Sequence, residues 1–126
     1  MAESFNDLIE AAIIATKNSY SPYSHFSVGA ALLSRDGKIY TGCNVESVSF
    51  PVGICAEQSA LAAAVNDGKR KFTAIAIYSD SGVTPCGKCR QALAEFGDMW
   101  VITIDSKGVK KDLTLSKLLP DAFNKI

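Results

Sequence analysis

Two short segments of the sequence contain side chains that could bind a metal ion, Cys55-Ala56-Glu57 and Pro85-Cys86-Gly87-Lys88-Cys89. Cys86 and Cys89 are three residues apart at the start of an expected helix, so both sulfurs can face one point. Cys55 also opens an expected helix, and the partial positive charge of a helix N-terminus favours thiolate over thiol. Three thiolates gathered in this way suit Zn²⁺, which accepts sulfur ligands in tetrahedral geometry.

The fourth coordination position decides what such a metal could do. Glu57 follows Cys55 by two residues, so it points to another side of the helix and is poorly placed as a ligand. It is well placed to reach a water molecule at an open position, which is a hydrolytic arrangement. Cys43 and His25 have no neighbouring Cys or His and are interpreted as packing or loop residues. A closed, structural zinc site is the alternative.

The hydrophobic periodicity predicts the elements that must position these residues. The expected order is a helix over 4–18, strands over 26–34 and 38–44, a helix from 55 to the stop at Gly68, a central strand over 72–78, a helix over 86–96, a strand over 100–104, an edge strand over 109–113 and a helix over 116–119. This alternation predicts an α/β fold with a mixed sheet and helices on both faces.

Composition restricts the range of functions further. The chain has 126 residues, which predicts a single domain over 1–126, and its formal net charge is zero. A net charge of zero argues against nucleic acid or a membrane as partner, because proteins that bind them electrostatically carry a surplus of Lys and Arg. The first ten residues do not resemble a signal peptide, so we expect a cytoplasmic location. In that reducing compartment, the four cysteines are candidates for metal binding or catalysis rather than disulfides.

The combination of Cys55-Ala56-Glu57 with Pro85-Cys86-Gly87-Lys88-Cys89 resembles the signature of the zinc-dependent cytidine deaminases. The resemblance covers nearly the whole chain. It includes further segments similar to those of the small, free-nucleoside branch with three cysteine ligands: Ser21-Pro22-Tyr23-Ser24, Phe26-Ser27-Val28-Gly29-Ala30-Ala31-Leu32, Gly42-Cys43-Asn44-Val45-Glu46 and Leu118-Leu119-Pro120-Asp121-Ala122-Phe123.

The resemblance implies a role for each matching residue. Cys55, Cys86 and Cys89 would hold one Zn²⁺ per subunit, and Glu57 would shuttle protons. The substrate-binding residues that it implies are Asn44 and Glu46 for the ribose hydroxyls, Phe26 for the pyrimidine ring, the backbone of Ala56 and Thr84 for the base carbonyl and amino group, Phe50 near the ribose, and Phe123 in the site of a neighbouring subunit. The implied fold is a three-layer α/β/α sandwich with a mixed sheet of about five strands, assembled as a homotetramer with shared active sites.

The reaction implied by the resemblance is hydrolytic deamination of free cytidine and 2′-deoxycytidine in pyrimidine salvage. Glu57 would take a proton from the zinc-bound water, and the resulting hydroxide would attack C4 of the pyrimidine. The same carboxyl would then protonate N3 and the departing amine, which releases ammonia and leaves uridine or 2′-deoxyuridine. The alternatives are a deaminase of a related nucleoside analogue such as blasticidin S, and a non-catalytic module stabilised by structural zinc.

One residue departs from the pattern of the three-cysteine branch. An Arg commonly follows the catalytic Glu in that branch, whereas this chain has Gln58. Zinc with three thiolates carries one net negative charge and Glu57 adds another, so a missing Arg leaves charge uncompensated. We expect Gln58 and Arg90 to lie around the ligands. The hypothesis is that helix N-termini, together with Arg90, supply the compensation.

Overall fold

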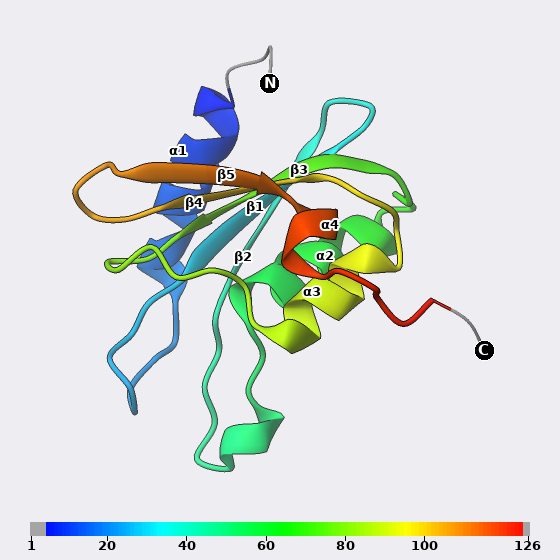
Figure 1. The fold of residues 1–126 in the computed structure, drawn as a ribbon. Helices are drawn as coiled ribbons and strands as arrows, with labels where there is room; N and C mark the ends of the chain where they lie inside the picture. Colours follow the sequence, from blue (N-terminus) through cyan, green and yellow to red (C-terminus); the bar gives the residue numbers. More distant parts are fainter. Residues whose placement is uncertain (1–4, 125–126) are drawn as a thin grey trace.

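A five-stranded sheet forms the centre of the computed structural model, which describes residues 5–124 (Figure 1). The strand order is β2-β1-β3-β4-β5; β3 and β4 are parallel, and all other neighbours are antiparallel. The elements are α1 (Asn6–Ala15), η1 (Thr16–Asn18), β1 (Gly29–Ser34), β2 (Ile39–Cys43), η2 (Phe50–Val52), α2 (Ala56–Asn66), β3 (Phe72–Tyr78), α3 (Gly87–Ala94), β4 (Trp100–Ile104), β5 (Lys110–Thr114) and α4 (Leu115–Leu118).

Helices cover both faces of the sheet, which makes three layers (Figure 1). The alternation of side chains along β1 shows the division: Ala31 packs with α1, whereas Ala30 and Leu32 pack with α2 and α3. The central strand β3 is almost entirely buried, as its continuous apolar run predicts. The predicted three-layer α/β/α fold with a mixed sheet is therefore confirmed.

Two glycines set the distance between the helices and the sheet. A Cβ atom at Gly42 of β2 would lie 2.4 Å from the backbone nitrogen of Ala60 and 2.6 Å from the carbonyl oxygen of Ala56, both in α2. At Gly29 of β1, a Cβ atom would lie 2.1 Å from the carbonyl oxygen of Ala12 in α1. Backbone atoms cannot move aside as a flexible side chain can. Gly42 therefore allows the N-terminal half of α2 to lie directly on β2.

The predicted element order is confirmed, and the differences lie at the ends of elements. The first strand begins at Gly29 rather than at residue 26, because the Asn44 side chain, not a neighbouring strand, binds the Phe26 carbonyl oxygen and the Val28 N–H. The first helix tightens into the 3₁₀ turn η1 after Ala15. None of the helices within residues 5–124 combines the length and apolar character needed to cross a membrane.

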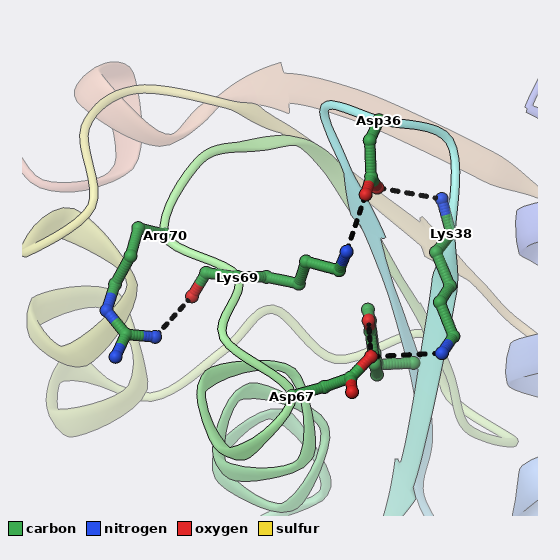
Figure 2. A network of polar contacts seen from close by, with 6 residues as sticks. Asp36, Lys38, Asp67, Lys69 and Arg70 are labelled. Carbon is green, nitrogen blue, oxygen red and sulfur yellow. Dashed lines mark hydrogen bonds and ion pairs between the residues drawn. The ribbon is translucent and has the colours of Figure 1, made fainter.

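A polar network ties the C-terminal end of α2 to the β1–β2 turn (Figure 2). The Lys69 ammonium lies 2.6 Å from the Asp36 carboxylate, and the Lys38 ammonium lies 2.9 Å from the Asp67 carboxylate. The Tyr40 hydroxyl also donates to Asp67. The hydrogen bond from Lys69 lowers the pKa of Asp36 to about 2, and burial together with the bond to Asp67 raises the pKa of Tyr40 to about 12. The network holds the end of α2 that is remote from Cys55.

These pKa shifts predict how stability depends on pH. Asp36 has a lower pKa in the folded state, so its contribution is complete above its unfolded pKa of about 3.9 and is lost as the pH falls through about 2. We expect Asp36→Asn to lower the free energy of unfolding at pH 7, and the difference from the wild type to shrink between pH 4 and pH 2. Urea denaturation over this range measures the difference. In a Lys69→Met background the same substitution should have a smaller effect, and a pH-independent difference in the wild-type background would contradict the prediction.

Candidate active site

Three cysteine sulfurs meet where the N-termini of two helices converge. Cys55 is the N-cap of α2, Cys86 is the N-cap of α3, and Cys89 lies in the first turn of α3. Their sulfur atoms all lie within 4.8 Å of one another, and those of Cys86 and Cys89 are 3.6 Å apart. Tetrahedral zinc with Zn–S bonds of about 2.3 Å places its sulfur ligands about 3.8 Å apart. The donor set and its spacing therefore fit zinc.

No other cluster within residues 5–124 brings together three or more metal-binding side chains. Cys43, the fourth cysteine, is half-buried on β2 opposite Gly29 and is not part of this cluster. The interpretation of Cys43 as a packing residue is consistent with this position. The protein therefore offers three sulfur ligands, which leaves one position of a tetrahedral metal open.

Burial and neighbouring groups shift the acidity of the site. Burial raises the pKa of the Cys55 and Cys89 thiols. Burial opposes the ionisation of Cys86 too, but hydrogen bonds from Cys89 and other groups outweigh it and lower the pKa of that thiol. Burial also raises the pKa of the Glu57 carboxyl. A divalent cation stabilises coordinating thiolates, so metal binding overcomes the cost of ionising the two buried cysteines.

Glu57 lies in the first turn of α2 and is only 6% exposed, yet it lines a cavity of about 610 Å³. Cys55 and Cys86 line the same cavity, so the carboxyl and the cysteine cluster open onto one space. A closed structural zinc site has no comparable opening beside a carboxyl group. The arrangement can bind a small molecule, activate water on a metal and move protons through one carboxyl group.

Most of the predicted site residues line this cavity. They are Phe26, Asn44, Glu46, Phe50, Cys55, Ala56, Glu57, Thr84 and Cys86. Cys89 is fully buried next to the other two sulfurs. Phe123 does not line the cavity; it is 73% exposed on the C-terminal segment, where its carbonyl oxygen accepts a hydrogen bond from Gln91. Phe123 is therefore a predicted substrate contact that does not reach the cavity of its own chain.

The side chains of Gln58 and Arg90 form hydrogen bonds with the backbone around the cysteines. The Cys55 N–H donates to Oε1 of Gln58 at 3.3 Å, so this side chain caps α2. Arg90 donates to the carbonyl oxygens of Pro85 and Leu118, both at 2.7 Å, and to the Thr84 hydroxyl at 3.1 Å. Its hydrogen-bond partners in residues 5–124 do not include a sulfur atom. Arg90 thus braces the loop before Cys86, and any effect on the thiolates acts through space.

The side chain of Asn44 uses most of its hydrogen-bonding capacity within the protein. Its Oδ1 accepts from the Val28 N–H at 3.0 Å and from the Ser19 hydroxyl at 2.5 Å, and its Nδ2 donates to the Phe26 carbonyl oxygen at 2.8 Å. Two lone pairs and one N–H are occupied, which leaves one N–H free. Asn44 can therefore offer a ligand a donor and no acceptor.

The carboxylate of Glu46 is bound by the loop before β1. Its Oε1 accepts from the N–H groups of Tyr23 and Ser24 at 3.0 and 3.1 Å, and its Oε2 accepts from the Ser24 hydroxyl. The bonds from the Ser24 side chain and backbone lower the pKa of Glu46. An ionised carboxylate has about four acceptor positions, so one remains for a ligand.

Several residues that line the cavity have no role predicted from the sequence, namely Tyr23, Ser24, Val28, Val45, Ser47, Gly53, Ile54 and Val83. Ser24 stands out among them because it contacts Glu46 through both its backbone and its side chain. A run of short polar residues before a strand is the only local feature that marks it, and such runs are common in ordinary loops. Its partner is 22 residues away in the sequence, so the contact appears only in the folded chain.

The position of Gln58 predicts the effect of restoring a cation there. Gln58→Arg places a positive charge beside the thiolates but removes the acceptor for the Cys55 N–H. We expect zinc affinity to rise about tenfold, since groups around metal ligands change affinity by about 10–100-fold. We also expect the metal-free protein to lose about 1 kcal/mol of stability with the cap. Competition with a chelator and thermal denaturation measure the two effects.

Gln58→Ala is the matched control, because it removes the same acceptor without adding charge. It should lose the same stability with no gain in zinc affinity. Equal zinc affinities for the Arg and Ala variants would contradict a role for charge at this position.

Comparisons with known proteins identify the relatives of this chain. The family model described as "Cytidine and deoxycytidylate deaminase zinc-binding region" matches residues 2–104. The cytidine deaminase of Sporosarcina psychrophila is 49% identical over 115 residues, which cover 88% of this chain and 85% of that protein. The cytidine deaminase of Halalkalibacterium halodurans is 44% identical over 120 residues, covering 92% of this chain and 91% of that protein.

Solved structures give the same result. The crystal structure of cytidine deaminase from Burkholderia pseudomallei has a TM-score of 0.92 and 42% identity, covering 96% of this chain and 100% of that one. The crystal structure of cytidine deaminase from Mycobacterium tuberculosis has a TM-score of 0.85 and 37% identity, covering 98% and 99%. Because sequence and structure agree along most of its length, the chain belongs to the zinc-dependent cytidine deaminase family.

Proposed function

We propose that this protein hydrolyses free cytidine and 2′-deoxycytidine to uridine and 2′-deoxyuridine with release of ammonia. The observation that carries the proposal is the buried Glu57 carboxyl, which opens onto the same cavity as the three-cysteine cluster. Cys55, Cys86 and Cys89 would hold zinc, which supplies a Lewis acid that makes water nucleophilic near neutral pH. The family and the names of its relatives support this substrate class.

Glu57 accepts and donates the protons that move during the reaction. Water adds its oxygen to C4 of the base, and one of its protons passes to the Glu57 carboxylate. The carboxyl group then donates this proton to N3. The remaining proton of the added water, now on the C4 hydroxyl, passes through Glu57 to the C4 amino group, so the C4 carbonyl forms as the C–N bond breaks and ammonia leaves. Water and cytidine thus become uridine and ammonia. A raised pKa suits a group that must both accept and return a proton.

Asn44 and Glu46 together suit the ribose. Asn44 has one free N–H, and Glu46 has one free acceptor position. A hydroxyl group both accepts and donates, so a single ribose hydroxyl can satisfy both residues. Phe26, half-buried against the core, presents an aromatic surface to the base.

The charge of the cavity favours free nucleosides over nucleotides. The described residues that line it include Glu46 and Glu57 but no Lys, Arg or His. A phosphate group would therefore meet acidic side chains without a basic partner. The same feature, together with the zero net charge of the chain, argues against a polynucleotide substrate, since the chain has no surplus of basic side chains to attract its phosphates.

Replacing Glu57 with Gln separates catalysis from metal binding. We expect Glu57→Gln to keep its zinc and its thermal stability but to lose about 10³-fold or more in kcat, the upper range for a general acid–base group. Cytidine deamination is followed by the loss of ultraviolet absorbance and by ammonia release, and zinc by elemental analysis. Glu95→Gln, an exposed change at the C-cap of α3, is the matched control and should retain full activity. A wild-type protein that deaminates neither cytidine nor 2′-deoxycytidine would exclude the proposed function.

We also propose that the chain works as a homotetramer in which active sites are shared. The segment between β2 and α2, which extends away from the sheet in Figure 1, exposes Val48, Phe50 and Val52 to 80%, 73% and 69%. Exposed apolar groups gathered on one segment are typical of a protein–protein interface. Phe123 is equally exposed and outside the cavity of its own chain, which suits a contact with the site of a neighbouring subunit.

A mixing experiment tests the shared site. We expect Phe123→Ala to lower kcat/KM about tenfold or more, and Glu57→Gln to be inactive. In hybrids of the two variants, an intact Phe123 from the Glu57→Gln subunit can complete a site that retains Glu57. Co-expressed subunits should therefore recover activity that neither variant has alone, with mass measured by light scattering. Activity no greater than the average of the separate variants would contradict the sharing of sites.

The remaining proposals concern organisation and location. A single sheet packs with all the described helices, which supports one domain over residues 1–126. The four described cysteines are free thiols, and three of them are needed as ligands, which supports a reducing, cytoplasmic environment.

A further inference from the structure

The Glu46 carboxylate is held by two consecutive residues of the loop before β1. Its three protein donors are the backbone N–H groups of Tyr23 and Ser24 and the hydroxyl of Ser24. Ser24 alone supplies two of the three, one to each carboxylate oxygen. Two bonds from one residue to both oxygens fix the plane of a carboxylate as well as its position.

The Ser24 hydroxyl is itself oriented by a second contact. Its oxygen accepts the Phe26 N–H at 3.0 Å, which leaves the hydroxyl proton for Glu46. The intervening residue, His25, has a positive φ of 58°, and its N–H donates to the Ser21 carbonyl oxygen at 3.0 Å. The tight turn at His25 directs the Ser24 and Phe26 N–H groups toward their acceptors. The hydroxyl thus links the loop to Glu46 in one fixed orientation.

We propose that Ser24 is a positioning residue for nucleoside selection, which holds Glu46 so that its free acceptor position faces the ribose hydroxyl. The proposal rests on the proposed function, because it takes Glu46 as the ribose contact. The free position is on Oε2, since Oε1 already accepts two N–H groups. Ser24 and the ribose hydroxyl would therefore bind the same oxygen atom from two directions.

Loss of the Ser24 hydroxyl should leave the base contact in place. The Phe26 carbonyl oxygen accepts from Nδ2 of Asn44 at 2.8 Å, and the Val28 N–H donates to Oδ1 of the same side chain at 3.0 Å. Asn44 thus fixes the backbone on both sides of Ser27 without help from Ser24. A variant without the hydroxyl should recognise the pyrimidine normally and the ribose poorly.

The experiment compares cytidine with an analogue that lacks the 2′ and 3′ hydroxyls of the ribose but keeps the base. In Ser24→Ala we expect KM for cytidine to rise about tenfold, the size typical of one lost hydrogen bond to a charged group, with kcat within about twofold of the wild type. The inhibition constant of 2′,3′-dideoxycytidine, measured in the same assay, should change less than about twofold. Ser24→Thr keeps a hydroxyl at this exposed position and should restore the wild-type KM. Ser27→Ala is the matched control and should behave as the wild type, because within residues 5–124 the Ser27 hydroxyl forms its hydrogen bond with that of Ser21 rather than with Glu46.

Each of the following results would contradict the proposed role of Ser24. An equal loss of affinity for both ligands would show that Ser24 supports the fold of the site in general. An unchanged KM for cytidine, or a Thr variant that behaves like the Ala variant, would show that the hydroxyl does not act through Glu46. If the wild-type protein deaminates no cytosine nucleoside, the proposed function fails, and the role of Ser24 fails with it. This outcome can be told apart from the other three, because each of those requires an active wild-type protein.

Discussion

The meeting of two helix N-termini is the constraint on which the rest of the structure depends. Three sulfurs can share one metal ion only if Cys55 at the start of α2 and the Cys86–Cys89 turn of α3 lie within one coordination sphere. The sheet makes this possible by holding both helices on the same face. Gly42 lets α2 lie directly on β2, and the network around Asp67 fixes the other end of that helix. Packing at both ends of α2 thus decides whether the three sulfurs meet.

The second part of the site depends on the amide of Asn44 rather than on regular secondary structure. Its bonds to Ser19, Phe26 and Val28 join the end of β2 to the loop that precedes β1. The Glu46 carboxylate joins the same loop at Ser24. The residues proposed to contact the ribose are therefore also the residues that fold the wall of the cavity. Ligand recognition and local order use the same polar groups, which is why few of their hydrogen-bonding positions remain free.

The features that the sequence predicted best are those that depend on residues close together in the chain. Cys86 and Cys89 lie three residues apart, and Glu57 lies two residues after Cys55, so helical geometry predicted one pair of sulfurs facing the same point and a carboxyl group close to Cys55. The strand over 100–104 and the central strand over 72–78 were predicted with the bounds that the structure shows, because each is a continuous apolar run. Periodicity carried no information about Asn44 or Glu46, which were predicted only from resemblance.

Two contacts between distant parts of the chain had no signal in the sequence. Arg90 reaches Leu118 across 28 residues, and Ser24 reaches Glu46 across 22. Neither pair has a local pattern, since each depends on how loops return past the helices. The first strand was predicted three residues too long at its start because the apolar residues Phe26 and Val28 alternate as in a strand. The Phe26 carbonyl oxygen and the Val28 N–H bind the Asn44 side chain instead of a neighbouring strand, which no periodicity distinguishes.

The zero net charge of the chain conceals an uneven distribution of charge. Zinc with three thiolates and the Glu57 carboxylate would place about two negative charges at the junction of α2 and α3. The two helix N-termini oppose this charge with partial positive charges. Arg90 adds a full positive charge, because its described partners are two carbonyl oxygens and a hydroxyl rather than a carboxylate. Gln58 serves as the cap of α2, and our hypothesis is that the compensation which a neighbouring Arg would give is spread over the backbone and the next helix.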